Sequence, residues 1–272
     1  IKVAPSLSEK SQSKRSGELN RMLGDAYYKL GQYKEATPYL IKAAEQEGAD
    51  VQDYYLLGFS LMEEKDFKQA KTYLAKAIEK KDSLAQNALY HLGICCIETN
   101  DKSNAKAMFK EASEMDFDMT IKEKALLNYA KVACETSSAY NEPLKAFQTF
   151  TEQFPNSDKA NEAKEYLAQL YGEMKNYRDA IEMIEQMSER NLSVNKAYQR
   201  LCLNRAIELF NENRTDDALI YLDKSLSQTH DNSLTAAAYY LKAEAYHQMG
   251  EYELSIKNLN TFYSVPGADK SQ

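Results

Sequence analysis

A leucine–glycine pair recurs at a nearly constant interval in the first part of this chain, and this recurrence constrains the fold more than any other feature. The pairs are Leu23-Gly24, Leu57-Gly58 and Leu92-Gly93. The glycines are therefore 34 and 35 residues apart (58 − 24 and 93 − 58). Each glycine is followed, twelve residues later, by an alanine, at Ala36, Ala70 and Ala105. A period of this length indicates that one supersecondary unit is stacked repeatedly, instead of a single globular core.

Each repeat has the pattern of two amphipathic helices joined by a short turn. In the first repeat Leu23 and Tyr27 are four residues apart, and after Gly31 the apolar residues return at helical spacing from Ala36 onward. Apolar residues at this spacing form one face of a helix. Glycine inside a helix costs about 1 kcal/mol relative to alanine. We therefore expect the two helices to cross closely at Gly24, with Ala36 as the small surface on the second helix.

Later repeats keep this order at a longer interval. Alanine stands at the glycine's position in four more repeats, at Ala130, Ala168, Ala206 and Ala243. These alanines are 38, 38 and 37 residues apart (168 − 130, 206 − 168 and 243 − 206). The fourth repeat is the least regular, because residues 136–143 form a longer turn. The sequence thus predicts seven helix pairs, and it contains no convincing strand alternation.

The repeats resemble the tetratricopeptide repeat. The first reads Asn20-x2-Leu23-Gly24-x2-Tyr27 and then Ala36-x3-Leu40-x2-Ala43, with the same order of large, small and aromatic positions as that family. The resemblance implies an all-α fold, a right-handed α–α superhelix of about seven helix-turn-helix repeats. Stacked arrays of this kind usually bind partners on an extended surface.

The segment 147–157 has a narrower resemblance. Its aromatic-Pro-Asn-Ser turn predicts that Pro155 ends one helix and that Asn156 or Ser157 caps the next. The segment is similar to repeats in bacterial cell-envelope adaptors, such as the lipoprotein of the outer-membrane β-barrel assembly machine and the periplasmic Tol-Pal coordinator. This favours the bacterial periplasm or cell envelope, with the cytoplasm as the alternative. The chain does not begin with methionine, so the compartment stays unknown.

The repeat pattern divides the chain into five segments. They are residues 1–16, a flexible lead-in or the end of a preceding repeat; 17–118, three regular repeats; 119–192, two divergent repeats; 193–265, two further repeats; and 266–272, an inter-repeat tail. Solenoids normally end in a polar capping repeat. None is evident after Phe262, so we expect the chain to be part of a longer array.

Composition excludes some partners. The chain has 34 Lys and Arg against 41 Asp and Glu, a net charge of −7. Nucleic-acid backbones are bound by clustered basic residues, so we expect no nucleic-acid partner. No apolar run approaches the eighteen or so residues that span a bilayer, so no membrane span is predicted. Only five prolines and nine glycines in 272 residues favour long helices.

Residues with catalytic or metal-binding chemistry are few and scattered. The cysteines are expected to be small buried hydrophobes on first helices: Cys95, Cys96, Cys134 and Cys202. His91 and Cys95 share a helical face, but a metal site needs three or four ligands and no second pair exists. Neither a phosphate-binding glycine loop nor a G-x-S-x-G motif occurs. We therefore expect no metal, no cofactor and no enzyme activity.

The family resemblance implies that the first helix of each pair lines an inner groove that receives peptides. In the first three repeats the groove positions carry apolar and aromatic residues that the helix pair does not need for its own packing: Tyr28, Tyr55, Phe59, Met62, Tyr90, Ile94 and Ile97. Exposed surfaces of this composition are typical of protein-binding sites. The alternative is that neighbouring first helices, or a residue of the lead-in, bury these side chains.

Some members of the family hold chaperone C-termini with a carboxylate clamp of Lys and Asn. The matching positions here are Arg21, Asp25, Leu56, Asn87 and His91. Only Arg21 has the required charge, and Asp25 would repel a carboxylate. This departure disfavours a chaperone co-factor.

The fifth repeat carries an acidic stretch that would suit a basic segment of a partner: Glu162, Glu165, Gln169 and Glu173. Taken together, the sequence predicts a non-catalytic scaffold or adaptor that binds a peptide or helical segment of a protein partner in its groove. Two alternatives stay open. One is a structural spacer or oligomerisation segment, and the other is a regulatory repeat region of a larger enzyme or transcription factor.

Overall fold

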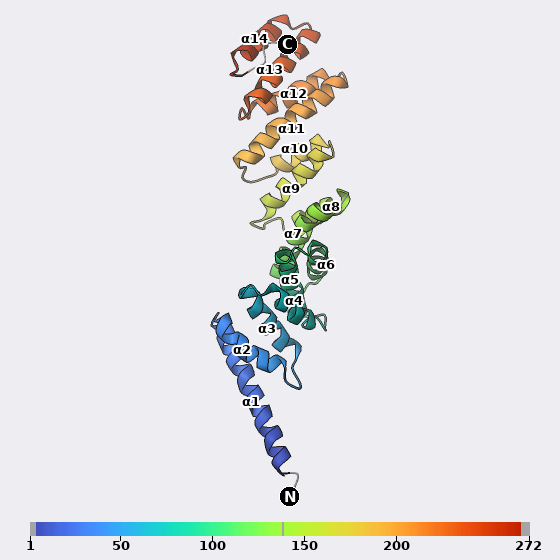
Figure 1. Cartoon of the computed structure of the whole chain (residues 1–272). Coiled ribbons are helices and arrows are strands. Elements are labelled where there is room, and N and C mark those ends of the chain that lie inside the picture. Colours follow the sequence, from blue (N-terminus) through green and yellow to red (C-terminus); the bar gives the residue numbers. More distant parts are fainter. Residues whose placement is uncertain (1–3, 138, 268–272) are drawn as a thin grey trace. The chain divides into compact units, whose positions relative to one another are not determined.

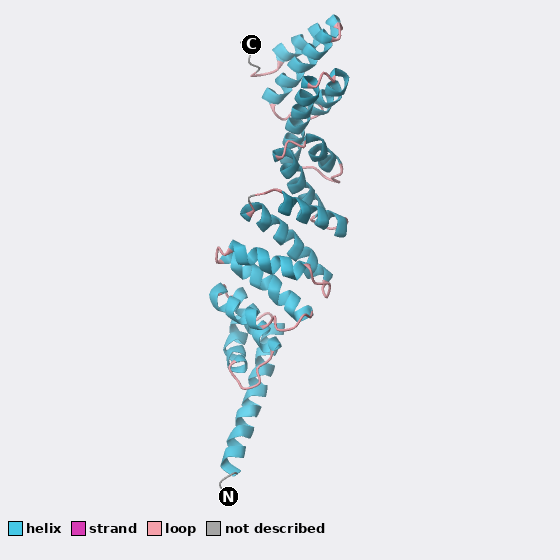
Figure 2. Cartoon of the chain, turned by 90° about the vertical axis from the view of Figure 1, so that its right-hand side faces the viewer, coloured by secondary structure: helices cyan, strands magenta, loops and turns pink. Residues whose placement is uncertain are grey.

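The computed structural model describes residues 4–137 and 139–267, with side chains from Ser16 onward. Every regular element in this part of the chain is a helix, fourteen in all, and loops join them (Figure 2). The prediction of an all-α fold is confirmed. Residues 268–272 of the predicted tail lie outside the described residues.

The chain divides into two units, Ile1–Ala146 and Phe147–Gln272, and the division falls within α8 (Asn141–Gln153). The first unit contains the helices coloured from blue to green in Figure 1: α1 (Ala4–Lys29), α2 (Tyr33–Ala44), α3 (Val51–Glu63), α4 (Phe67–Lys76), α5 (Ser83–Glu98), α6 (Lys102–Ser113) and α7 (Met119–Thr136). Residues 4–16, which the sequence marks as a lead-in, are part of α1.

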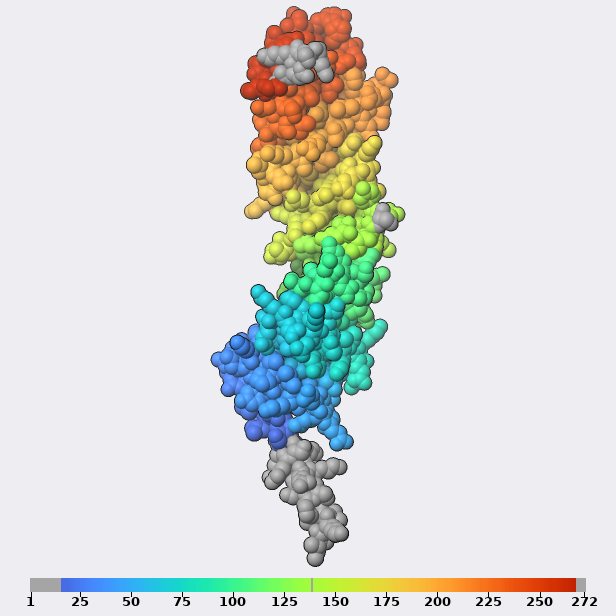
Figure 3. Space-filling model, viewed as in Figure 1, coloured from blue at the N-terminus to red at the C-terminus, as the bar shows by residue number. Residues whose placement is uncertain are grey.

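The second unit continues with the helices coloured from green-yellow to red: α9 (Ala160–Glu173), α10 (Tyr177–Glu185), α11 (Leu192–Asn211), α12 (Thr215–Leu226), α13 (Asn232–Gln248) and α14 (Tyr252–Ser264). Helices that follow one another in the chain pack together in each unit, as α1 with α2 and α11 with α12. The second helix of a pair also packs on the first helix of the next, as α2 on α3. This is the solenoid of helix pairs that the repeat predicts. Within each unit, neighbouring parts of the surface belong to helices that are consecutive in the chain (Figure 3).

Paired helices approach closely at the repeated glycines. A Cβ at Gly58 would stand 2.8 Å from Cγ and 2.9 Å from the backbone nitrogen of Leu74, and a Cβ at Gly93 would stand 2.6 Å from the ring of Phe109. All three distances are far shorter than an ordinary van der Waals contact. The predicted close crossing is therefore present. The nearest atoms belong to the large residue four positions after the repeated alanine, and that alanine is itself fully buried, as at Ala70.

The turn between the two helices of a pair has one recurring backbone conformation. In six pairs the turn places one residue at positive φ: Gly31, Lys65, Asn100, Lys175, Asn213 and Gly250. Around Lys65, its own N–H bonds the carbonyl of Met62 and the N–H of Asp66 bonds that of Leu61, each at 2.9 Å. This is the Schellman arrangement, which satisfies the last carbonyls of the first helix and reverses the chain.

Aspartate and asparagine side chains start most of the first helices. Oδ1 of Asp50 accepts the N–H groups of Gln52 and Asp53, and Asp53 in turn accepts the N–H of Asp50, which completes a capping box. Asp82 and Asp118 cap α5 and α7 through their own carboxylates. These caps satisfy N–H groups that have no partner inside the helix.

The Pro155 turn differs in detail from the prediction. The α8 helix ends at Gln153, just before Pro155, but α9 has Lys159 as its N-cap, with no side-chain hydrogen bond to the helix. Ser157 instead accepts the N–H of Lys159 at 2.9 Å. Neither Asn156 nor Ser157 is thus the cap itself, because the turn runs on past both before the helix begins.

Candidate partner-binding surface

The seven predicted groove residues fall on the first helices of three successive pairs. Tyr28 lies on α1, and α3 carries Tyr55, Phe59 and Met62. The remaining three, Tyr90, Ile94 and Ile97, lie on α5. The repeat register therefore places all seven on the helices that the sequence assigns to them.

Aromatic rings from these helices form one continuous chain of contacts. Phe59 lies at the centre, with its ring centroid 5.5 Å from that of Tyr28, 6.1 Å from that of Tyr55 and 4.7 Å from that of His91. Edge-to-face and tilted geometries at such distances are favourable. We call the set Tyr28, Tyr33, Tyr55, Phe59, Tyr90 and His91 the aromatic surface, and each member keeps part of its side chain exposed.

Two members of the aromatic surface are not among the seven predicted residues. Tyr33 begins α2 and lies 5.6 Å from both Tyr28 and Phe59, ring to ring. His91 bridges Phe59 on α3 and Tyr90 on α5. In the sequence Tyr33 belongs to the second helix and His91 stands one position after the groove position, so only the contacts between repeats reveal them.

Burial shifts the pKa values of two residues of this surface, Tyr28 and His91. Loss of hydration raises the pKa of Tyr28 to about 12, and its hydroxyl interacts with those of Tyr33 and Tyr55. The pKa of His91 falls to about 4, first because of burial and second because of the positive charge of Lys124. Nδ1 of His91 is buried without a hydrogen-bond partner among the described residues. Tyr28 and His91 are therefore uncharged at neutral pH.

The three aliphatic members behave differently from the rings. Met62 is buried in the core of the first unit, and only 8% of it is exposed. Ile94 is partly buried against the same core. Ile97 is 37% exposed and is the most accessible of the seven. Met62 and Ile94 therefore support the surface from beneath, and Ile97 is available at its edge.

Arg21, the one clamp position with the required positive charge, forms an ion pair within the chain. Its guanidinium donates to the carboxylate of Asp53 on the next first helix and to the carbonyl of Gly48. The side chain of Asp53 is almost fully buried. Arg21 is thus used to join two repeats.

The other chemical expectations concern cysteines and metals. Cys95, Cys96 and Cys202 are buried, and burial raises the pKa of each thiol, to about 12 at Cys95 and Cys202. Among the described residues no group of three or more His, Cys, Asp or Glu could hold a metal ion.

No described helix is long and apolar enough to cross a membrane.

A family comparison agrees with the repeat. The model of the tetratricopeptide repeat matches residues 19–50, 54–79, 86–119 and 236–265. The first three segments follow the pairs from α1 to α6, and the fourth follows α13 and α14. These four segments of the chain are tetratricopeptide repeats. No curated protein matches it in sequence.

Solved structures share this fold. YrrB, described as a tetratricopeptide repeat protein with an unusual peptide-binding site, is 20% identical, with a TM-score of 0.50 over 60% of this chain and 79% of that chain. The TPR2AB domain of yeast Sti1 in its complex with pHSP90 is 16% identical, with a TM-score of 0.50 over 90% and 89%. A tetratricopeptide repeat protein from Parabacteroides merdae is 16% identical, with a TM-score of 0.50 over 94% and 95%. At these identities the likeness concerns the fold.

Proposed function

We propose that the chain is a non-catalytic scaffold that binds a peptide or helical segment of a protein partner on the aromatic surface. The observation that supports this best is the run of partly exposed rings across α1, α3 and α5, which continues without a break from Tyr28 to Tyr90. Aromatic side chains are enriched at protein interfaces because they supply large apolar area at small entropic cost. YrrB, which shares the fold, is described with a peptide-binding site, and the Sti1 domain is described in a complex with pHSP90.

The chemistry of the surface favours an uncharged or apolar partner segment. A chaperone C-terminus is disfavoured, because Arg21 is paired with Asp53 and Asp25 lies next to it on α1. An envelope location, a spacer role and oligomerisation stay predictions.

The test is peptide selection followed by variant binding. Random peptides displayed on phage are selected on the immobilised chain and then measured against Tyr55→Ala/Phe59→Ala. Because both rings pack on their neighbours, a thermal melt by circular dichroism accompanies the double variant, and the milder Ile97→Ser is measured in parallel. We expect loss of binding in the folded double variant and weaker binding in Ile97→Ser. Selected peptides that bind both variants as they bind the wild type would exclude the aromatic surface.

A further inference from the structure

One side of the first helix pair is apolar and uncovered. Leu19, Met22, Ala26 and Leu30 follow one another at helical spacing along α1 and into the turn after it. All four are exposed, Met22 to 70%. We call this stripe the leading face.

The repeat register shows what such a face contacts elsewhere in the chain. The residues 34 positions after the first three members of the leading face are Asp53, Leu56 and Ser60 on α3. All three are buried, and Leu56 is only 6% exposed. The helix that carries them packs on α2 of the preceding pair. The leading face is therefore the side of a first helix on which a preceding second helix packs.

The helix α14 has a second apolar stripe on its surface. Tyr252, Ile256 and Tyr263 are four and seven residues apart, so they lie along one line of the helix. All three are exposed, Ile256 to 59%. Ile256 directly follows Ser255, which stands twelve residues after Ala243, at the position of the repeated alanine. We call this stripe the trailing face.

Hydrogen bonds show which positions meet where one helix pair joins the next. The residue directly after the repeated alanine bonds the turn of the next pair: Thr37 donates to Glu64, and Lys71 donates to Thr99 at 3.4 Å. Glu64 and Thr99 each stand six residues after the repeated glycine, which is the position of Leu30 in the first repeat. At a junction in this register, the residue after the alanine therefore meets the residue at the position of Leu30.

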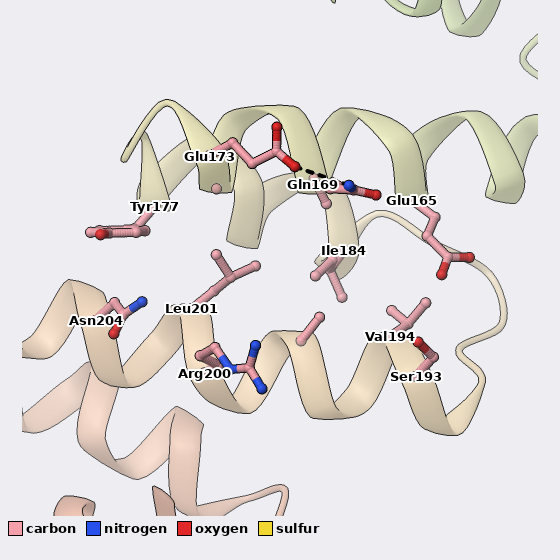
Figure 4. Close-up of a pocket in the computed structure, with 13 residues that line it drawn as sticks. Glu165, Gln169, Glu173, Tyr177, Ile184, Ser193, Val194, Arg200, Leu201 and Asn204 are labelled. Atoms are coloured by element: carbon pink, nitrogen blue, oxygen red, sulfur yellow. Dashed lines mark hydrogen bonds between the residues drawn. The ribbon is translucent and has the colours of Figure 1, made fainter. Parts of the chain in front are cut away.

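The junction of α10 with α11 is the loosest in this register. Leu201, which corresponds to Leu19, is only partly buried and projects into a pocket of about 380 Å³ between α9 and α11 (Figure 4). The predicted acidic stretch contributes three residues to the lining of this pocket: Glu165, Gln169 and Glu173. In every other repeat after the first, the residue at the position of Leu19 is buried, as at Ala88. A junction thus tolerates a local gap, whereas the leading face is uncovered along its whole length.

We propose that the leading face of one copy of this chain packs on the trailing face of a second copy, in the register of the solenoid. Ile256 of one copy then meets Leu30 of the next. Because consecutive helices run in opposite directions, Tyr263 near the end of α14 meets Leu19 near the start of the described side chains of α1. The contact removes four large apolar side chains from water. It joins two different faces, so each copy keeps one face for a further copy.

The chemistry of the two faces favours a second copy over a repeat of interior composition. The interior junctions pair polar side chains, such as Thr37 with Glu64. A neighbour with such residues would bury a polar group without a partner against Leu30 or Ile256, which is unfavourable. Terminal repeats of a solenoid normally have polar outer faces. Here both faces are apolar, and at the positions that meet.

The test uses two variants, each with one blocked face. Leu30→Asp blocks the leading face, and Ile256→Asp blocks the trailing face. Both positions are exposed, so both variants should fold, which a thermal melt by circular dichroism checks. A carboxylate against an apolar partner should weaken association of either variant alone by about tenfold or more. The wild-type chain should form species larger than one chain in sedimentation velocity at concentrations up to about 1 mM.

An equal mixture of the two variants gives the decisive result. Leu30→Asp keeps its trailing face and Ile256→Asp keeps its leading face, so the mixture should form a complex of two chains with the wild-type affinity and nothing larger. A contact between two identical faces would behave differently, because one of the two variants would then associate alone like the wild type. That result, or a mixture that stays monomeric, overturns the proposal.

Two controls should associate like the wild type. Leu254→Asp places the same charge on α14 two residues before Ile256, about 200° around the helix and outside the trailing face. Tyr55→Ala/Phe59→Ala alters the aromatic surface, so its result separates this contact from the proposed peptide binding. A wild-type chain that stays monomeric up to about 1 mM would assign the two faces to other repeats or to another protein, and would overturn the proposal.

Discussion

The guanidinium of Arg21 on α1 donates to both carboxylate oxygens of Asp53 on α3, with 2.6 Å between Nε and Oδ1. The same carboxylate accepts the N–H of Asp50 at 3.0 Å. One buried acid therefore joins the first repeat to the second and also caps the helix that carries it. The hydrogen bonds to Asp53 raise the pKa of Arg21, so its guanidinium stays charged.

Arg21→Met should destabilise the first unit more than the loss of an ordinary surface contact. The Asp53 side chain is 2% exposed and would be left as a buried charge without its counter-ion. Stranded charges of this kind cost about 3 kcal/mol or more. The measurement is the urea midpoint by circular dichroism. Arg214→Met, which breaks an exposed pair with Asp217, is the control and should leave the midpoint unchanged. Equal midpoints for the two variants would contradict the prediction.

Alanine at Gly58 or Gly93 should destabilise the chain although alanine is the better helix former. The helical preference favours alanine by about 1 kcal/mol. Against this, the new methyl group would overlap the backbone of Leu74 or the ring of Phe109, and overpacking of this kind costs about 1–3 kcal/mol. We expect a net loss of about 1 kcal/mol, measured by thermal unfolding.

Gly172→Ala provides the matched comparison for these glycines. A Cβ there would meet only Cδ2 of Leu201, at 3.1 Å. This flexible side-chain end has room to shift, so the variant should be neutral or slightly stabilising. A stabilising effect at all three positions would show that the helix pairs are looser than the structure indicates.

Stability should depend on pH through His91. Its pKa in the folded chain is about 4, below the ordinary value of 6.5, so between these values the unfolded chain binds more protons than the folded one. Stability is therefore full above pH 6.5 and falls by about 1.4 kcal/mol per pH unit on acidification below it. The measurement compares urea midpoints at pH 7 and pH 5. His91→Phe keeps a ring in the cluster and should lose this dependence, so identical pH slopes for the two proteins would refute the assignment.

Lys65→Gly should stabilise the chain. Lys65 has a φ of 65°, a conformation in which its Cβ is unfavourable and glycine is not. The gain should be about 0.5–1 kcal/mol, visible as a higher melting temperature. Ala75→Gly, at an exposed position inside α4, should instead cost about 1 kcal/mol. A loss of stability in both variants would mean that this turn does not hold Lys65 in the left-handed region.

Helix pairing was predictable from the sequence because it depends on a local period, and the period also places Tyr55 and Phe59 on the correct helix. The turn conformation was not predictable at Lys65, since lysine has no preference for positive φ and only glycines elsewhere in the register indicate it. The sequence singled out His91 only as a clamp position and as a possible metal ligand, and its place among the aromatic rings was missed for another reason. Its role depends on contacts with the preceding repeat, and a repeat pattern does not encode how neighbouring repeats pack against each other.

The recurring Schellman turn has a consequence for how the chain assembles. The turn at Lys65 is closed entirely by backbone atoms within six residues of one another, and the helices that it joins pack against each other. Each hairpin therefore depends only on itself and on the hairpins next to it, and most contacts join residues that are near in sequence. Low contact order of this kind gives rapid folding. A nascent chain can therefore add each hairpin to the one before it as it leaves the ribosome, without waiting for segments that are distant in sequence.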